Sequence, residues 1–128
     1  MEISKRDWKL FREYVPKWQT RYIGKLNREY IELLSGEGDA ADHFWQLEER
    51  IRKDKKHPGV SIEISKGDAV YDLVLLCRTG VIDMSDLEEF SDSTRDAVRQ
   101  LLDLRCQNGH QTDTTGKDDP GRERDTSG

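Results

Sequence analysis

The sequence predicts an all-α protein, and three observations lead to that prediction. Apolar residues recur at helical spacing along most of the first hundred positions, as in Trp18, Tyr22 and Leu26. Ser or Asp followed three residues later by an acid, a pattern that caps helix N-termini, precedes several of these stretches. Only residues 60–65 alternate apolar and polar side chains as a strand does. We therefore expect a compact bundle of five or six helices.

The bundle is expected to surround one buried helix at about 67–79. Between Val70 and Cys77 only Asp72 is polar, so apolar side chains point in every direction from the helix axis. A helix that is apolar all round is a buried helix. An aspartate introduced at Leu73 or Leu75 should then unfold the domain.

The other helices are bounded by proline, glycine and serine. Pro16 lacks an N–H, so it should break or kink the chain or begin the next helix. The segments 35–38 (Ser-Gly-Glu-Gly) and 57–59 (His-Pro-Gly) should each end a helix. In the helix expected at 40–56, a narrow apolar stripe that should face the core consists of Phe44, Leu47 and Ile51. Trp45 falls outside this stripe, so it either meets another helix or lies exposed. The expected helices span about 5–15, 17–34, 40–56, a short stretch from 85, and 94–105.

Residues 60–65 are the one candidate strand, and two readings stay open. The segment could pair with its copy in a dimer, or it could run extended across the helices. We favour the extended reading because the sequence offers no second strand. For the same reason we favour a monomer over a homodimer.

The chain should form one helical domain, 1–106, followed by a disordered tail, 107–128. The tail has no apolar residue at all, so nothing would offset the entropy lost on ordering it.

Composition bears on location. The chain has 128 residues, of which 37% are charged and 34% apolar, and its net charge is −5. Its longest apolar run is far shorter than the roughly 18 residues that a membrane span needs. The N-terminus lacks an apolar signal core, and the two cysteines form no C-x-x-C pair. We expect a cytoplasmic protein with no membrane partner.

Charge is unevenly divided along the chain. Residues 1–36 carry eight bases and five acids, whereas residues 60–106 carry ten acids and five bases. Either the two halves attract one another, or the acidic half meets a basic partner. The candidate partner-binding acids are Asp83, Asp86, Glu88, Glu89 and Asp92. A candidate basic ridge consists of Lys17, Arg21, Lys25 and Arg28.

No pattern indicates an enzyme, a metal site or a cofactor. The stretch from Gly80 to Phe90 is similar to the second half of a calcium-binding loop. In such a loop Leu75 and Cys77 would occupy ligand positions, and neither supplies a hard oxygen ligand. We therefore expect no catalytic residue, no metal and no cofactor.

Two stretches, 4–36 and 80–92, resemble a group of small uncharacterised helical proteins from gut Firmicutes, sometimes mislabelled "multidrug transporter". The resemblance covers roughly 4–104 and implies a bacterial, cytoplasmic, compact helical domain. It transfers no active residues, and the absence of an apolar span argues against the transporter label.

These observations favour a non-enzymatic protein-interaction or regulatory module whose partner is another protein, in particular a basic one. One alternative is a nucleic-acid-associated protein that uses the basic ridge, although the net negative charge disfavours nucleic acid. The other is a small acidic inhibitor that mimics DNA toward a basic protein.

Overall fold

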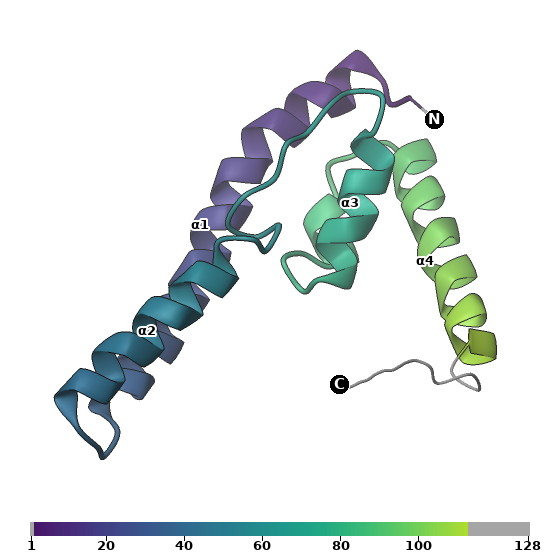
Figure 1. Ribbon diagram of the computed structural model, residues 1–128. Coiled ribbons are helices and arrows are strands. Elements are labelled where there is room, and N and C mark those ends of the chain that lie inside the picture. Colours follow the sequence, from purple (N-terminus) through teal and green to yellow (C-terminus); the bar gives the residue numbers. More distant parts are fainter. Residues whose placement is uncertain (1, 113–128) are drawn as a thin grey trace.

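The computed structural model describes residues 2–112, with the side chains of residues 2–104. Within this range the chain forms four α-helices and one short 3-10 helix, and it contains no strand (Figure 1). The all-α prediction is confirmed for the described residues, but the expected five or six helices are not all found. The elements are α1 (Lys5–Ser35), α2 (Ala40–Asp54), α3 (Ala69–Arg78), η1 (Met84–Leu87) and α4 (Asp92–Thr112).

The first two expected helices are one helix, because α1 continues through Pro16. Proline removes one backbone hydrogen bond and leaves the carbonyl oxygen four residues earlier without its usual donor. Pro16 and Arg12 both lie on the exposed side of α1, where water can reach that carbonyl. Val15 and Trp18 are buried on the opposite side and hold the helix against the core. Of the alternatives expected at Pro16, the break and the start of a new helix were therefore wrong.

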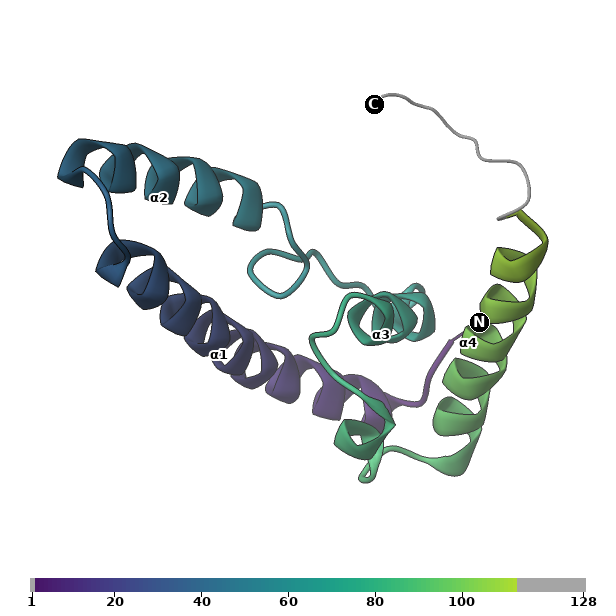
Figure 2. The same ribbon diagram turned by 90° about the horizontal axis from the view of Figure 1, so that it is seen from below.

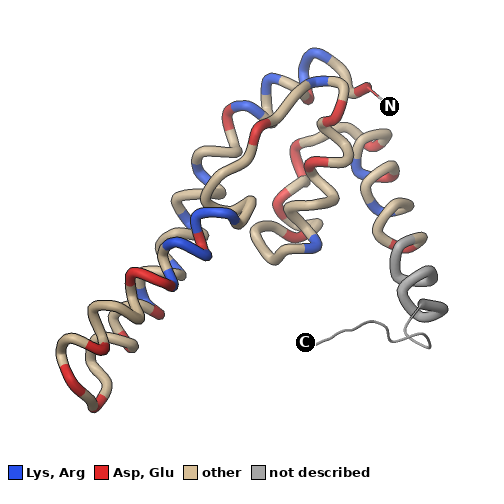
Figure 3. The backbone as a smooth tube through the Cα atoms, in the orientation of Figure 1, with Lys and Arg blue, Asp and Glu red and all other residues tan. Residues whose placement is uncertain are grey.

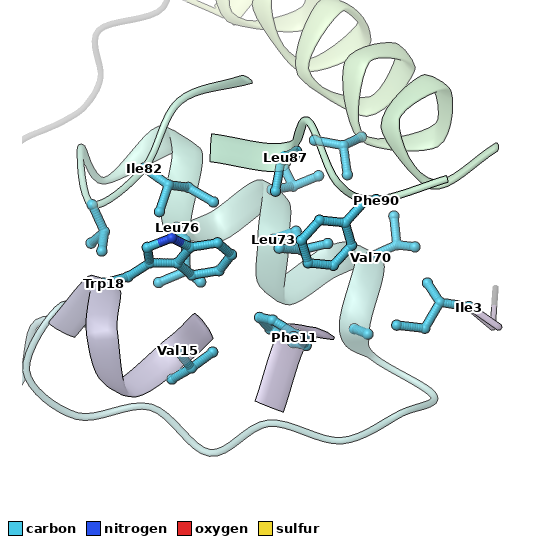
Figure 4. Packing of buried hydrophobic residues seen from close by; sticks show 14 residues of the cluster. Ile3, Phe11, Val15, Trp18, Val70, Leu73, Leu76, Ile82, Leu87 and Phe90 are labelled. Carbon is cyan, nitrogen blue, oxygen red and sulfur yellow. The ribbon is translucent and has the colours of Figure 1, made fainter. Parts of the chain in front are cut away.

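The hydrophobic core lies in one lobe, here called the body, between the first half of α1, α3, η1 and the start of α4 (Figure 4). Phe11, Leu73 and Leu87 are fully enclosed there. Trp18 stacks near Phe90, with ring centroids 6.4 Å apart, and so joins α1 to the segment after η1. The core therefore needs residues from both ends of the domain.

The second half of α1 and the whole of α2 form a helical hairpin that projects from the body. We call residues 22–57 the arm (Figures 1 and 2). No residue of α2 is buried. The arm is held by a polar cluster in which Arg50 contacts Glu29 at 2.8 Å and the Tyr30 hydroxyl donates to Asp54 at 2.6 Å. The fold is therefore a body with an attached arm, and α2 does not wrap the core as a bundle helix would.

A tight junction joins the arm to the body. The rings of Tyr22 and His57 stack with centroids 4.5 Å apart. Gly59 lies against the Tyr22 ring, and a Cβ atom at this position would come within 2.4 Å of it. A side chain at Gly59 would have to displace the ring, so this position requires glycine.

The segment after the junction is extended and unpaired, as the favoured reading of residues 60–65 expected. Ile62 and Ile64 pack against the core, while Ser61, Glu63 and Ser65 are exposed. Apolar and polar side chains therefore alternate because this extended segment crosses the helices with one side against the core and the other in solvent.

Helix α3 has one exposed side, which corrects the expectation of burial all round. Ala69, Val70, Leu73, Val74 and Leu76 are buried, but Tyr71 is 53% exposed and Leu75 is 40% exposed. The described residues that pack around α3, from α1, η1, α4 and the segment 60–65, leave the side with Tyr71 and Leu75 exposed. Helix α3 therefore has more apolar side chains than the rest of the described chain buries.

Two helix starts follow the predicted capping chemistry, whereas the N-cap residues of α2 and α3, Asp39 and Asp68, make no side-chain capping hydrogen bond. The Ser4 hydroxyl oxygen accepts from the Asp7 N–H, as expected. Asp83, rather than Ser85, caps η1, and Asp86 completes the capping box. At the other end of the domain, α4 extends to Thr112, beyond the expected end near Arg105. Most of the expected tail, from residue 113 onward, lies outside the described residues.

Candidate interaction surfaces

Asp7, in the first turn of α1, is fully buried against the start of α4. Both oxygens of Asp7 are enclosed, and the side chain accepts from the Ser91 hydroxyl at 2.6 Å and from the Thr94 hydroxyl at 2.6 Å. The Ser91 N–H adds a third donor at 3.2 Å. Burial alone would raise the pKa of Asp7, but these hydrogen bonds and the nearby Arg6 guanidinium hold it below its ordinary value. Asp7 thus anchors α4 to α1 and is a structural group.

The predicted basic ridge and the predicted acidic face meet at one ion pair. The Arg21 guanidinium binds both carboxylate oxygens of Asp86, at 2.9 and 3.0 Å. It also donates to the Val81 carbonyl at 2.9 Å. Burial opposes ionisation of Asp86, but the hydrogen bonds from Arg21 and from the Asp83 backbone lower its pKa overall. This ion pair is a direct contact between the basic and the acidic segment, and it supports the interpretation that the two halves of the chain attract one another.

A second contact between the two charged segments lies beside this ion pair. The Tyr14 hydroxyl donates to the Glu89 carboxylate, and Arg6 donates to the Glu89 carbonyl at 2.8 Å. Lys17 lies over the Tyr14 ring, 5.6 Å from its centroid. A shallow pocket of about 440 Å³ opens here, lined by both charge signs. Mixed charge in an open pocket gives it no clear preference for an anion or a cation.

The remaining candidate acids are mostly used locally. Asp83 caps η1 by accepting from the Ser85 N–H at 3.0 Å, and Asp92 pairs with Arg95 one turn along α4. Among the described residues, Glu88 is the one member of the acidic set whose side chain makes no hydrogen bond or ion pair. Four of the five acids therefore already have partners within the chain.

The other members of the basic ridge spread along the exposed side of α1. Lys25 lies over the Tyr22 ring, 5.4 Å from its centroid, and Arg28 is exposed on the arm. Because Arg21 is held by Asp86 and Val81, the ridge does not present four free cations. This weakens the reading of the ridge as a phosphate-binding surface.

Several large apolar side chains of the arm are exposed and have no cover among the described residues. Phe44 is 60% exposed, Trp45 63% and Ile31 62%. Leu34, Ile51 and Ile23 are exposed to smaller extents on the same two helices. Phe44, Leu47 and Ile51 border a shallow groove of about 360 Å³ along α2. Sequence reasoning assigned Phe44, Leu47 and Ile51 to a core-facing stripe and so missed this surface.

The described residues offer little for catalysis or metal binding. No group of three or more His, Cys, Asp or Glu side chains within residues 2–104 could hold a metal ion. Cys77 is half-buried, and burial together with nearby Asp83 and Asp86 raises its pKa to about 11. A thiol with that pKa is a poor nucleophile near neutral pH.

Comparisons of the chain with protein-family models, with curated proteins and with solved structures found no match. No helix of the described chain combines the length and the apolar character that crossing a membrane requires.

Proposed function

We propose that this protein is a protein-interaction module that binds its partner through the apolar side of the arm. The observation that carries the proposal is the exposure of Phe44, Leu34 and Ile51 on a hairpin that projects from the body. Scattered exposed apolar residues are ordinary, but a contiguous exposed apolar patch marks an interaction site.

Helix geometry indicates that four exposed apolar residues share one side of the arm, whereas Trp45 and Ile31 point away from the opposite helix of the hairpin. On α2, His43, Leu47 and Asp54 face α1, and Phe44 and Ile51 lie about 90° from that direction at about 100° per residue. On α1, Ile23 and Leu34 lie about 90° in the same rotational sense from the side that faces α2. In two antiparallel helices, equal rotation in the same sense points to the same side of the hairpin.

The ion pair between Glu29 and Arg50 agrees with this assignment. Both residues lie on the other rotational side of the line between the helices, and their side chains meet at 2.8 Å. The arm therefore has an apolar side, with Ile23, Leu34, Phe44 and Ile51, and a polar side, with Glu29 and Arg50. We call the former the apolar side of the arm.

The other candidate surfaces offer less to a partner. The acidic set is largely engaged by Arg21, Tyr14 and local caps. A basic partner or a DNA-mimic role would have to compete with these internal contacts. The apolar side of the arm has no such occupant among the described residues.

A matched pair of variants tests the proposal. Phe44→Lys places a charge on the apolar side, whereas Gln46→Lys adds the same charge to an exposed position of α2 that points away from it. We expect Phe44→Lys to abolish capture of any partner, whether another protein from bacterial lysate or this chain itself, and Gln46→Lys to retain it.

Both variants should remain folded, because neither residue is buried in the chain. A third variant, Glu88→Lys, probes the acidic set in the same assay. Loss of capture in Glu88→Lys with full capture in Phe44→Lys would overturn the proposal and make the acidic set the better candidate for the binding surface.

A further inference from the structure

The two antiparallel helices of the arm have the geometry of one half of a four-helix bundle, with the apolar side of the arm where the other half would pack. Two antiparallel helices of this kind form one layer, and a second layer of two helices completes the packing around a central apolar seam. Helix α2 has 15 residues and none is buried. Isolated helices of about that length are marginal in water, so α2 stands to gain from a second layer.

Charge along α2 indicates what the second layer is. The tip of the arm is acidic, with Glu37, Asp39 and Asp42, while the end beside the body is basic (Figure 3). The basic residues at that end are Arg50, Arg52, Lys53, Lys55 and Lys56. A helix with opposite charges at its two ends is complementary to its own copy laid antiparallel, and it repels the same copy laid parallel.

From this complementarity we infer that the partner of the arm is a second copy of this chain, with the two α2 helices antiparallel across a two-fold axis. The inference rests on the proposed function of the arm. It does not use residues 60–65, which form no strand and supply no pairing edge. A two-fold contact is self-complementary, so one apolar patch serves both copies.

The apolar residues set the register. When Phe44 of one copy lies against Ile51 of the other, the two-fold relation places Ile51 against Phe44 as well. Lys55, one turn beyond Ile51 on the same side of α2, then lies level with Ala40 of the other copy and next to Asp39. Each end of the interface thus gains one oppositely charged pair.

The ion pair between Arg52 and Glu48 fits the same arrangement. Glu48 lies at the outer edge of the apolar side, where its carboxylate is already bound by Arg52 on the same helix. Near the two-fold axis the two copies of Glu48 approach one another, and each carries its own Arg52. The long Arg52 side chain keeps its charge in water while its stem covers the seam.

The arrangement leaves the bodies free. With α2 antiparallel to its copy, the two arm tips point in opposite directions and the two bodies lie at opposite ends of the bundle. The acidic set and the Asp7 anchor are on the body and take no part in the contact.

Sedimentation equilibrium of the purified full chain tests the inference. We expect the mass of two chains for the wild type and for Gln46→Lys, and the mass of one chain for Phe44→Lys. A wild type that stays monomeric at its highest soluble concentration would overturn the inference. Arm-dependent capture of a different protein would in that case still support the proposed function, so the two can fail separately.

Charge reversal tests the antiparallel register. Lys55→Glu and Asp39→Lys should each weaken the dimer by about tenfold, and the double variant should recover most of that loss. Asp39 makes no side-chain capping bond, so its replacement leaves the start of α2 without a lost cap. Thermal unfolding of each variant serves as the control for folding. Failure of the double variant to recover the dimer would overturn the register, and a dimer indifferent to Phe44→Lys would overturn the surface.

Discussion

The carboxylate of Asp7, in the first turn of α1, accepts a hydrogen bond from the Thr94 hydroxyl, in the first turn of α4. The two residues are 87 positions apart, and both are buried. Their contact ties together the two ends of the described domain.

Replacing Asp7 should destabilise the domain far more than replacing an exposed aspartate of α4. Asp7→Ala leaves the Ser91 and Thr94 hydroxyls buried without their acceptor and should cost about 2 to 3 kcal/mol. Asp96→Ala removes only an exposed pair with Arg99 and should cost about 0.5 kcal/mol or less. Urea unfolding of both variants measures the difference. Equal losses would show that the hydrogen bonds of Asp7 stabilise the domain no more than an exposed ion pair does.

Acid should weaken the protein through the same carboxylate. The pKa of Asp7 is lowered in the folded state, so the folded state binds its proton less readily than the unfolded chain does. The resulting stabilisation is present above the ordinary carboxyl pKa, about 3.9, and is lost as the pH falls through the lower folded value. Asp86 contributes in the same direction.

Unfolding free energy measured from pH 6 down to pH 2 checks this sign. The curve of Asp7→Asn should fall less steeply with acid than the wild-type curve, since that variant has no proton to bind at this site. A parallel pair of curves would contradict the assignment of this acid sensitivity to Asp7.

The two leucines of α3 should respond in opposite ways to the same substitution. Leu73 is fully buried, so Leu73→Asp should prevent folding. Leu75 is 40% exposed, so Leu75→Asp should remain folded with a loss of about 1 kcal/mol. Circular dichroism and thermal unfolding distinguish the two. An unfolded Leu75→Asp would restore the expectation, drawn from the sequence, that α3 is buried on every side.

Cys77 should react slowly with thiol reagents. Its pKa of about 11 leaves very little thiolate at pH 8, so its reaction should be at least about a hundredfold slower than that of a free cysteine. The measurement uses a Cys106→Ser background, so that a single thiol is followed. In urea the rate should rise to that of an ordinary thiol. Rapid reaction in the native protein would show that the Cys77 sulfur is open to solvent.

Much of the helical pattern was predictable because capping and periodicity act locally. Ser4 caps α1 as its spacing predicts, and the alternation in 60–65 does place Ile62 and Ile64 against the core. Pro16 misled the prediction because a local rule was outweighed by tertiary packing of Val15 and Trp18. The sequence could not show that Pro16 would be on the solvent side.

The candidate surfaces were predictable in composition but not in arrangement. Charge counts indicated that the halves could attract one another, yet only the fold shows that Arg21 and Asp86 are the residues that meet. The apolar side of the arm was hidden for a different reason. Phe44, Leu47 and Ile51 have the spacing of a core stripe, and spacing alone does not reveal whether anything lies opposite.

Because α1 is continuous through Pro16, it determines the direction in which the apolar side of the arm faces as well as the point where the arm joins the body. One uninterrupted helix carries the buried anchor at Asp7 and the exposed Leu34, so the two are in a set helical phase. Removing one residue from the arm portion of α1 would swing everything beyond it by about 100° around the helix axis. Removing seven from each helix of the hairpin would shorten its reach by about 10 Å and turn it by only about 20°. The direction in which the apolar side of the arm faces therefore depends on the number of residues in α1.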